Sequence, residues 1–338
     1  MRIGIFGTGR IAKRAVKEIM EVQGLKLAAV YNPNLQHAKE FAALTEGAMA
    51  TSSLDEFVGE IDAAYIATPH ALHYKYAKEM LLAGKHVLCE KPLTFNEGEA
   101  IELYGLAEDK KLVLMEAIKT AYCPGFKKIQ EVVESGAIGD VVDVEAAFTR
   151  LTLPPCREFE VEAYGGSFTE FGSYTLLPIF RFMGTKYREV QLRYIRAASG
   201  VDGYAKAEFV FGDMSRADSD GGAAFGFATA RTGLTAKSEG QLVITGTKGY
   251  ILVPSPWWLT KYFQVRHEDP GQIEENKCEF EGDGLRYEFR EFLTRAVSGD
   301  VIGSSRGFSE DQLFYQKEKE EAVARAKTFE YVISKLYR

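Results

Sequence analysis

The sequence predicts an α/β protein with two domains, an N-terminal doubly wound parallel sheet and a C-terminal α+β domain with an open, mostly antiparallel sheet. Two patterns carry this prediction. Up to about residue 119, short apolar runs alternate with segments of helical periodicity, as in a parallel sheet with helices on both faces. From residue 120 onward, longer runs alternate apolar and polar residues, as half-buried antiparallel strands do. We therefore expect domains at 1–119 and 120–338.

Local signals place the elements of the first domain. Pro69 ends one strand, because proline cannot donate to the ladder, and Gly84 is a suitable residue after a helix end. Asn96, with Glu99 three residues later, is typical of a helix start. We expect strands at 3–6, 27–31, 63–67, 86–89 and 112–115, and helices at 11–22, 36–44, 74–82 and 96–107.

The second half is expected to begin with a helix and to end with two. The expected helices are 124–134, 285–297 and 310–336, and the expected strands are 141–150, 190–196, 204–211, 224–231 and 241–245. The last helix carries a charge run at 317–321, which predicts a solvated helix face. No internal repeat or low-complexity tract interrupts this order.

Composition excludes several classes of protein. Hydrophobic residues make up 46% and charged residues 26% of the 338 residues, which is ordinary for a globular enzyme. A formal net charge of -7 argues against nucleic acid as a partner. The four cysteines form no CxxC pair, and the histidines show no metal-ligand spacing, so we expect neither disulfides nor a metal. A strand that begins at residue 2 and the lack of a long apolar run predict a cytoplasmic protein without a membrane partner.

A glycine-rich turn follows the first expected strand. Gly7-Thr8-Gly9-Arg10-Ile11-Ala12 fits the G-x-G-x-x-A pattern of a Rossmann dinucleotide site, in which the glycines admit a pyrophosphate at a helix N-terminus. Asn32 stands after the second strand, where an acidic residue commonly binds the ribose of NAD. Arg10 is either a partner for a 2′-phosphate or a solvent-facing charge. The cofactor is therefore NAD or NADP, and the sequence leaves that choice open.

Three further stretches extend the candidate site. Thr68-Pro69-His70 through His73 and Glu90-Lys91-Pro92 both follow expected parallel strands, at the edge where open α/β sheets bind ligands. The third is 165–174, GGSFTEFGSY. Together, and above all in the segment 84–93, GKHVLCEKPL, the chain resembles the glucose–fructose oxidoreductase / inositol dehydrogenase (Gfo/Idh/MocA) family over nearly its whole length. The segment 115–118, MEAI, and the spacing from Glu170 to Tyr174 resemble the dihydrodiol dehydrogenase / NADP-dependent xylose dehydrogenase branch.

The resemblance implies roles for individual residues. Lys91 would hydrogen-bond the reacting oxygen, and Tyr174 would act beside it as acid/base, since an ammonium group lowers the pKa of a nearby phenol. Glu170 and His73 complete the candidate catalytic set, and Lys119 and Tyr164 are candidate substrate contacts. The expected cofactor contacts are Gly7, Thr8, Gly9, Arg10, Ile11, Asn32, Thr68, Pro69, His70, Glu90 and Lys91.

Each role has a structural alternative. Lys91 could be a surface lysine before a turn, Tyr174 a buried aromatic residue and His73 a helix cap, while Glu170 could hold Lys91 or support the domain interface. The chain also departs from the family pattern. Glu170 stands where an aspartate is usual, Leu177 where the inositol dehydrogenase branch has another aspartate, and Ala121 where an arginine is common.

The functional prediction is an NAD(P)-dependent dehydrogenase or reductase that acts on CH-OH groups of a sugar, polyol or related small molecule. One alternative is an NAD-dependent glycosidase-type hydrolase without net redox change, and another is a non-catalytic regulator that responds to a nucleotide or sugar. Lys91 and Tyr174 together disfavour the regulator, since a sensor needs no such pair. Open antiparallel sheets pack face to face between subunits, which predicts a homodimer or homotetramer formed through the second domain.

Overall fold

The computed structural model describes residues 1–212, 225–298 and 309–337 of the chain. These residues form two compact units, one of Met1–Lys119 with Glu281–Lys327 and one of Thr120–Phe280 with Thr328–Arg338. The first boundary lies where a boundary between domains was expected. The grouping differs from the expected second domain of 120–338, because Glu281–Lys327 packs with the N-terminal sheet.

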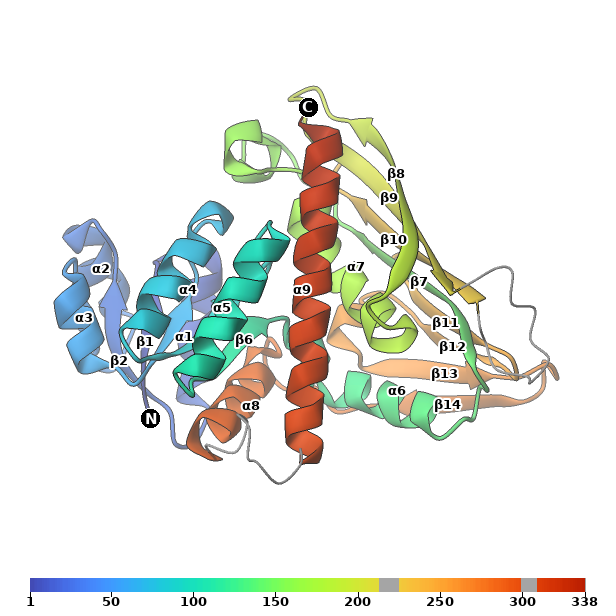
Figure 1. Cartoon of the computed structure of the whole chain (residues 1–338), viewed down its shortest axis with the longest axis horizontal. Helices are drawn as coiled ribbons and strands as arrows, with labels where there is room; N and C mark the ends of the chain where they lie inside the picture. Colours follow the sequence, from blue (N-terminus) through green and yellow to red (C-terminus); the bar gives the residue numbers. More distant parts are fainter. Residues whose placement is uncertain (213–224, 299–308, 338) are drawn as a thin grey trace. The chain divides into compact units, whose positions relative to one another are not determined.

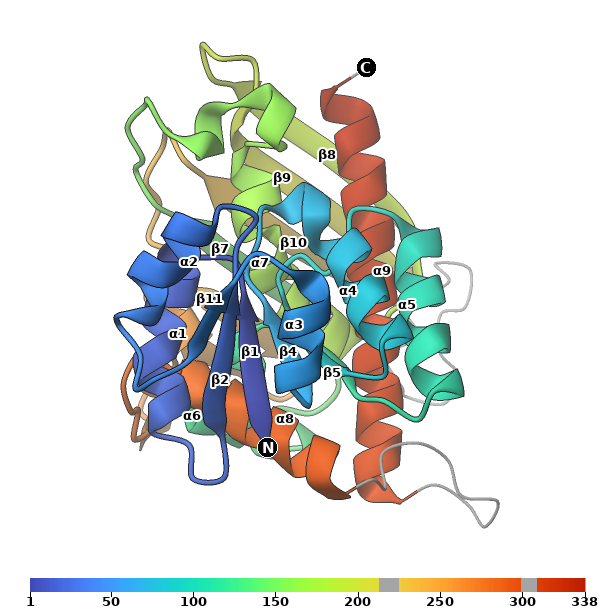
Figure 2. The ribbon, with the colours of Figure 1, turned by 90° about the vertical axis from the view of Figure 1, so that its left-hand side faces the viewer.

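The first unit contains a six-stranded parallel sheet in the order β3-β2-β1-β4-β5-β6 (Figures 1 and 2). Its strands are β1 (Arg2–Phe6), β2 (Lys26–Tyr31), β3 (Met49–Thr51), β4 (Ala63–Ile66), β5 (His86–Glu90) and β6 (Leu114–Ala117). Its helices are α1 (Arg10–Met20), α2 (Leu35–Ala42), α3 (Leu54–Glu60), α4 (His73–Leu82), α5 (Glu97–Asp109), α8 (Leu285–Ser298) and most of α9 (Glu310–Leu336), with a 3₁₀ turn η1 (His70–Leu72). The order reverses between β1 and β4, which is where such sheets bind ligands.

Aromatic side chains pack helices onto both faces of this sheet. On one face, the Phe6 ring lies 5.5 Å from that of Phe57 on α3 and 4.2 Å from that of Tyr76 on α4, centroid to centroid. On the other, the Tyr65 ring lies 5.1 Å from that of Phe289 on α8. Burial on both faces explains why the strands read as continuous apolar runs, and it explains why α8 belongs to the first unit.

The second unit contains an eight-stranded sheet in the order β14-β13-β12-β11-β7-β10-β9-β8, in which only the β7–β10 pair of the described strands is parallel. Its strands are β7 (Val141–Thr149), β8 (Tyr187–Arg196), β9 (Asp202–Gly212), β10 (Phe225–Gly233), β11 (Leu242–Gly246), β12 (Tyr250–Val253), β13 (Tyr262–Arg266) and β14 (Ile273–Lys277). Its helices are α6 (Pro124–Glu134) and α7 (Ser167–Met183), with 3₁₀ turns η2 (Lys119–Tyr122), η3 (Arg157–Phe159), η4 (Val161–Ala163) and η5 (Trp257–Leu259). Helix α7 packs against β7, β9 and β10.

The opposite face of this sheet is more polar. Along β9, Ala205, Ala207 and Phe209 are buried, whereas Lys206 and Glu208 between them are partly exposed. The expected antiparallel alternation is therefore present, with the apolar side chains turned toward α7.

Most expected elements are present within a few residues, and the differences have physical causes. The short β3 and α3 and the strands β12, β13 and β14 were not predicted, since runs of three to seven residues carry little periodicity. The segment of α7 was not predicted to be a helix, because this helix is buried almost all round and shows no polar face. Residue 224 of an expected strand lies outside the described residues.

The charge run on α9 is only partly the solvated face that was expected. Within it, Glu318 is 8% and Glu321 is 1% exposed. Glu318 pairs with Arg295 of α8 at 2.5 Å, and Glu321 lies 3.8 Å from Arg325. The prediction of a solvated face was therefore wrong for Glu318 and Glu321, because Glu318 faces α8 and Glu321 is buried beside Arg325 of α9 itself.

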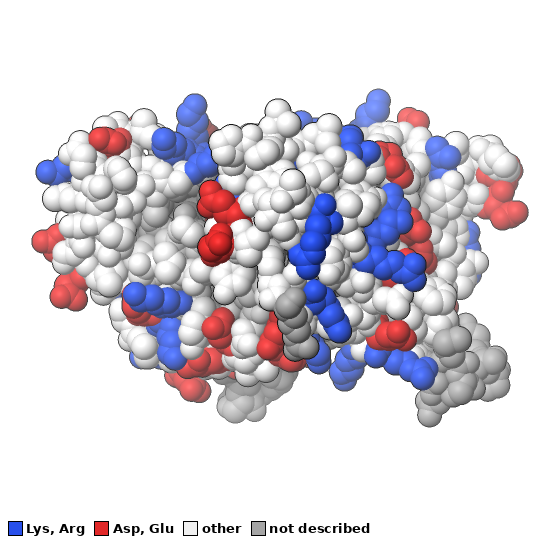
Figure 3. Space-filling view, turned by 90° about the horizontal axis from the view of Figure 1, so that it is seen from above, with Lys and Arg blue, Asp and Glu red and all other residues white. Residues whose placement is uncertain are grey.

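Charges are scattered on the face of the molecule shown in Figure 3. Basic and acidic side chains form small groups of both signs, separated by wide uncharged areas. Among the described helices, none is both long and apolar enough to cross a membrane.

Candidate dinucleotide and active site

The turn after β1 has the backbone that a bound diphosphate requires. Gly7 has φ of +108°, and a Cβ added to it would lie 2.6 Å from the carbonyl oxygen of Ala67. A Cβ on Gly9 would meet only that oxygen, at 4.0 Å, so the space beside Gly9 is open. Gly9 is also the N-cap of α1 and provides no side-chain cap. The first amides of α1 thus remain available to an anion, and Ala12 is buried against the sheet.

Polar side chains at the neighbouring strand ends complete this cradle. The Asn32 amide donates to the Thr8 hydroxyl at 2.8 Å, and its oxygen accepts from the Asn34 amide at 2.8 Å, so the end of β2 is tied to the glycine turn. Near the end of β4, the Thr68 hydroxyl is buried and has no hydrogen-bond partner among the described residues. An orphaned hydroxyl beside an open glycine turn fits a polar ligand. These residues therefore fit a dinucleotide.

Arg10 and Ile11 begin α1, with Arg10 exposed and Ile11 partly exposed. Pro69 is exposed and precedes His70 in η1. Their contacts with a cofactor stay predictions. Whether Arg10 binds the 2′-phosphate of NADP also stays open.

His73 lies where its ring cannot reach solvent. It is 0% exposed, and its Nδ1 and Nε2 atoms lie 2.7 Å from the Pro92 carbonyl oxygen and 3.0 Å from the Thr68 carbonyl oxygen. The ring of His70 packs edge-on at 5.5 Å. His73 therefore joins the segment after β4 to the segment after Lys91. This geometry suits a residue that positions Lys91, and the expected direct contact with substrate stays a prediction.

Lys91 follows directly after β5, beside a buried carboxyl group. Glu90 is 6% exposed, and its Oε1 accepts from the Tyr65 hydroxyl at 2.5 Å. Burial raises the pKa of Glu90, while the Lys91 charge and the Tyr65 hydrogen bond act in the opposite direction. Lys91 is partly exposed. The EKP segment therefore presents a lysine at a strand end and holds an acidic group behind it.

Lys119 is not positioned as an open substrate contact within its unit. It is 7% exposed, and its Nζ donates to the carbonyl oxygen of Asp283. Its charge also acts on Glu90 and on Glu288 of α8, which is 0% exposed. Sequence reasoning missed Tyr65 and Glu288, because nothing local to either residue shows that β4, β5 and α8 bring them together.

In the second unit, a remote aspartate caps the helix that carries Tyr174. Asp202 at the start of β9 is 0% exposed, and its Oδ2 accepts from the Ser167 hydroxyl at 2.6 Å and from the Phe168 amide at 2.8 Å. A Cβ on Gly166, which has φ of +133°, would lie 2.1 Å from Asp202 Oδ1. The second glycine of the GG pair is therefore required by this cap. Burial raises the pKa of Asp202 to about 6.

Glu170 and Tyr174 follow on α7, one turn apart. The Glu170 carboxylate pairs with Arg157 at 2.7 Å and is half-buried. Tyr174 is partly buried, and its ring lies 5.3 Å from that of Phe148 in a cluster that also contains Phe171 and Trp258. Glu170 thus holds the segment before α7. Tyr174 keeps an accessible portion, as an acid/base group requires.

Tyr164 lies in the turn before the two glycines, with φ of +54° and 37% of its surface exposed. The structure places it on the same segment as Arg157, and its contact with substrate stays a prediction.

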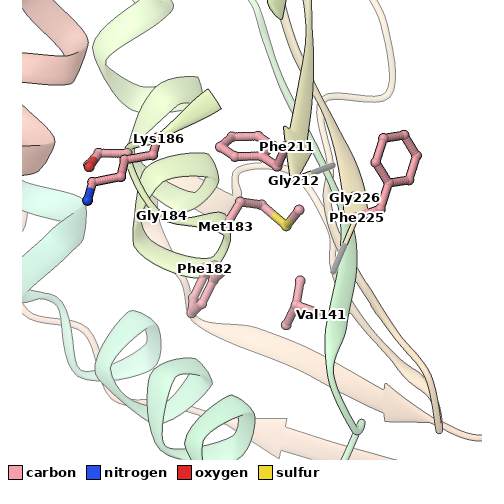
Figure 4. A pocket seen from close by; sticks show the side chains of 10 residues that line it. Val141, Phe182, Met183, Gly184, Lys186, Phe211, Gly212, Phe225 and Gly226 are labelled. Atoms are coloured by element: carbon pink, nitrogen blue, oxygen red, sulfur yellow. The ribbon is translucent and has the colours of Figure 1, made fainter. Parts of the chain in front are cut away.

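A separate pocket of about 470 Å³ lies at the other end of α7. Figure 4 shows Phe182 and Met183 on one side and Val141 and Phe211 on the strands opposite, while Lys186 extends away from them. None of the predicted site residues lines it. Among the described residues, no group of three or more His, Cys, Asp or Glu side chains could hold a metal ion.

Comparison with known proteins identifies both parts of the chain. Residues 1–118 match the family model described as the oxidoreductase family with an NAD-binding Rossmann fold, and residues 126–252 match the model of the Gfo/Idh/MocA C-terminal domain. A scyllo-inositol 2-dehydrogenase (NADP(+)) from Bacillus subtilis is 33% identical over 60% of this chain, and the match spans 64% of that relative's own length. The human trans-1,2-dihydrobenzene-1,2-diol dehydrogenase is 28% identical over 85% of this chain and 86% of its own.

Solved structures support the same fold. A 3-ketoreductase from Actinomadura kijaniata, in complex with NADP and TDP-benzene, has a TM-score of 0.78 at 20% identity and covers 97% of both chains. A UDP-N-acetylglucosamine 3-dehydrogenase from Acidithiobacillus ferrooxidans has a TM-score of 0.76 at 20% identity, over 100% of this chain and 99% of its own. The predicted fold class is confirmed, and this chain belongs to the Gfo/Idh/MocA family of oxidoreductases.

Proposed function

We propose that this chain transfers a hydride between NAD or NADP and a carbinol or carbonyl carbon of a sugar, polyol or related substrate. The observation that carries the proposal is the glycine turn, where Gly7 and Gly9 leave room for a diphosphate beside uncapped amides of α1. The family match over both parts of the chain adds to it. The nicotinamide, when bound, supplies the hydride acceptor or donor.

The chain's own residues then handle the oxygen and its proton. Lys91 donates a hydrogen bond to the reacting oxygen, which stabilises the negative charge that grows on it. Tyr174 takes the hydroxyl proton when the carbinol is oxidised and returns it when the carbonyl is reduced. Glu170 serves as a positioning residue, because its carboxylate is bound to Arg157.

The relatives narrow the substrate class. Inositol and a dihydrobenzenediol each carry the reacting oxygen on a six-membered ring beside a second oxygen. A further relative from Actinomadura kijaniata, 29% identical over 54% of this chain, is named for reduction of a didehydro-dideoxyglucose. We therefore expect a cyclic substrate with neighbouring oxygens, and we place inositols, pyranoses and cyclic diols first in the substrate panel.

The test is a panel of these substrates with each cofactor, read by the absorbance of the reduced nicotinamide. Lys91→Ala and Tyr174→Phe are each expected to lower kcat by about 10²-fold or more, while cofactor affinity is retained. Lys110→Ala and Tyr262→Phe, which change an exposed lysine and a strand tyrosine, serve as matched controls and should keep full activity.

Three outcomes would contradict the proposal. Inactivity toward every substrate of the panel would contradict the proposed hydride transfer. Activity retained in Lys91→Ala would contradict the role proposed for Lys91. Glycoside hydrolysis with no net change in the reduced cofactor would assign the chain to the hydrolase alternative.

We further propose that the chain forms a homodimer or homotetramer through the outer face of the eight-stranded sheet. The register places a basic row of Arg193, Lys206 and Arg231 across β8, β9 and β10. An acidic row on the same face contains Glu208 and Glu145, and it is displaced from the basic row by two residues along the strands. In a face-to-face dimer, a two-fold axis that lies in the interface, between the two rows and parallel to them, sets the basic row of one copy against the acidic row of the other.

Light scattering tests this assembly. The native chain should be dimeric or larger, and the double change Lys206→Glu with Arg231→Glu should shift it toward monomer, since like charges would then meet across the face. Lys277→Glu, on the edge strand β14, is the matched control. A monomeric native chain, or an assembly indifferent to the double change, would contradict the proposed face.

A further inference from the structure

A buried carboxyl group on α8 has no hydrogen-bond partner. Glu288 is 0% exposed, and neither of its oxygens accepts a hydrogen bond from any described group. A carboxylate in that position would be a bare charge in a low-dielectric interior, which proteins avoid by protonating the group. The function proposed above assigns no role to Glu288.

Charged groups at and around the EKP corner, the turn Glu90-Lys91-Pro92 at the end of β5, act on Glu288. The charges that act on it are, in order, those of Glu90, Lys119 and Glu18. Glu18 is held by Arg286 at 2.9 Å, and the Lys119 ammonium donates to the carbonyl oxygen of Asp283. The Lys119 charge favours an ionised Glu288, but among the described residues no hydrogen bond joins the two groups, and Glu18 adds a negative charge that opposes ionisation.

The remaining neighbour is Glu90, which is itself held from β4. The residue after Glu288, Phe289, packs its ring 5.1 Å from that of Tyr65, and the Tyr65 hydroxyl donates to Glu90 at 2.5 Å. Helix α8 therefore lies against the same face of the sheet as the Tyr65–Glu90 pair. Burial, and then the Glu90 charge, raise the pKa of Glu288 well above its usual range.

We propose that Glu288 carries a proton at neutral pH and is a positioning residue that keeps Glu90 as the ionised member of the Glu90–Glu288 pair. The part that concerns Lys91 rests on the proposed function. With Glu288 neutral, the charge of Glu90 is balanced by Lys91. The attraction between the two groups then holds the Lys91 ammonium in one orientation. Loss of the Glu288 proton adds a further negative charge near the Glu90–Lys91 pair and weakens the positive field that Lys91 provides at the reacting oxygen.

The proton itself can be observed without any turnover. Infrared spectra of the full chain, unlabelled and with ¹³C-glutamate, should show at pH 7 a protonated carboxyl band that shifts with the glutamate label. This band should be absent from Glu288→Gln and present in the control Glu291→Gln, which changes a partly exposed carboxylate on the same helix. No such band in the native chain, or a band that survives in Glu288→Gln, would overturn the proposal.

The positioning role has a separate readout. Glutamine cannot ionise, so the alkaline limb of kcat/KM should move to higher pH in Glu288→Gln and stay in place in Glu291→Gln. An unchanged limb in both would overturn the role while leaving the Lys91→Ala result, and thus the proposed function, intact. If Glu288→Gln does not fold, Glu288→Met provides the same two measurements, since an apolar side chain of similar length loses no hydrogen bond there.

Discussion

The cap on α7 makes the stability of this protein depend on pH, and Asp202→Asn is the perturbation that shows it. The folded protein raises the pKa of Asp202 from 3.8 to about 6, chiefly by burial. The folded state therefore binds the proton more tightly than the unfolded chain does. The contribution of this proton to stability is fully present below about pH 4 and is lost as the pH rises through about 6.

The magnitude follows from the size of the shift. One pKa unit corresponds to about 1.4 kcal/mol, so Asp202 lowers the free energy of unfolding by on the order of 3 kcal/mol between pH 4 and pH 7. No discount for solvent screening applies, because Asp202 is 0% exposed. Asparagine is nearly the same size and still offers an oxygen to Ser167 and to the Phe168 amide, yet it does not titrate over this range.

The assay is urea unfolding of the native chain and of Asp202→Asn at several pH values from 4 to 8. The difference between the two free energies of unfolding should change by about 3 kcal/mol in favour of the variant as the pH rises, and should be constant above pH 7. Taking the difference removes the contributions of other titrating groups that both proteins share. A difference independent of pH would refute the reasoning, since Asp202 would then not be a buried titrating cap.

Two further perturbations test the first unit. Gly7→Ala should weaken NADPH binding, measured by fluorescence titration, by at least about tenfold, because the new Cβ lies 2.6 Å from the Ala67 oxygen at a φ of +108°; wild-type affinity in the variant would count against the turn as the diphosphate site. Arg325→Met should lower the free energy of unfolding by about 3 kcal/mol or more, because it leaves the buried carboxylate of Glu116 without its ion-pair partner. Adding Glu116→Gln to this variant should restore part of the lost stability. Additive effects in that double-mutant cycle would exclude a direct pair.

Sequence periodicity predicted those parts of the fold whose signals are local. The Asn96 side chain accepts from the Glu99 amide as the motif indicated, and α5 begins at the next residue. The glycine turn was predicted because its chemistry lies in six consecutive residues. By contrast, α7 was hidden by its uniform burial, since a helix without a polar face gives no period to detect.

The contacts that were missed all come from distant segments. Asp202 caps a helix that begins 35 residues earlier, and its own surroundings in the sequence carry no capping signal. Glu288 stands in an ordinary amphipathic helix, and only the packing of Phe289 on Tyr65 shows that this helix covers the EKP corner. Such contacts depend on tertiary packing, which periodicity does not encode.

The segment 115–118 shows how a family resemblance and a physical role can differ. Glu116, 6% exposed, accepts from the Leu93 amide at 3.1 Å and from Arg325 at 2.8 Å, so it ties the segment after Lys91 to α9. Glu116, part of the segment that resembles one branch of the family, therefore holds the backbone after Lys91 in place. Glu90, Glu116 and His73 all hold the backbone or the charge around Lys91 from behind. It follows that the EKP corner depends on buried polar partners for its position, and that substitutions at these partners should alter the chemistry of Lys91 without touching a substrate.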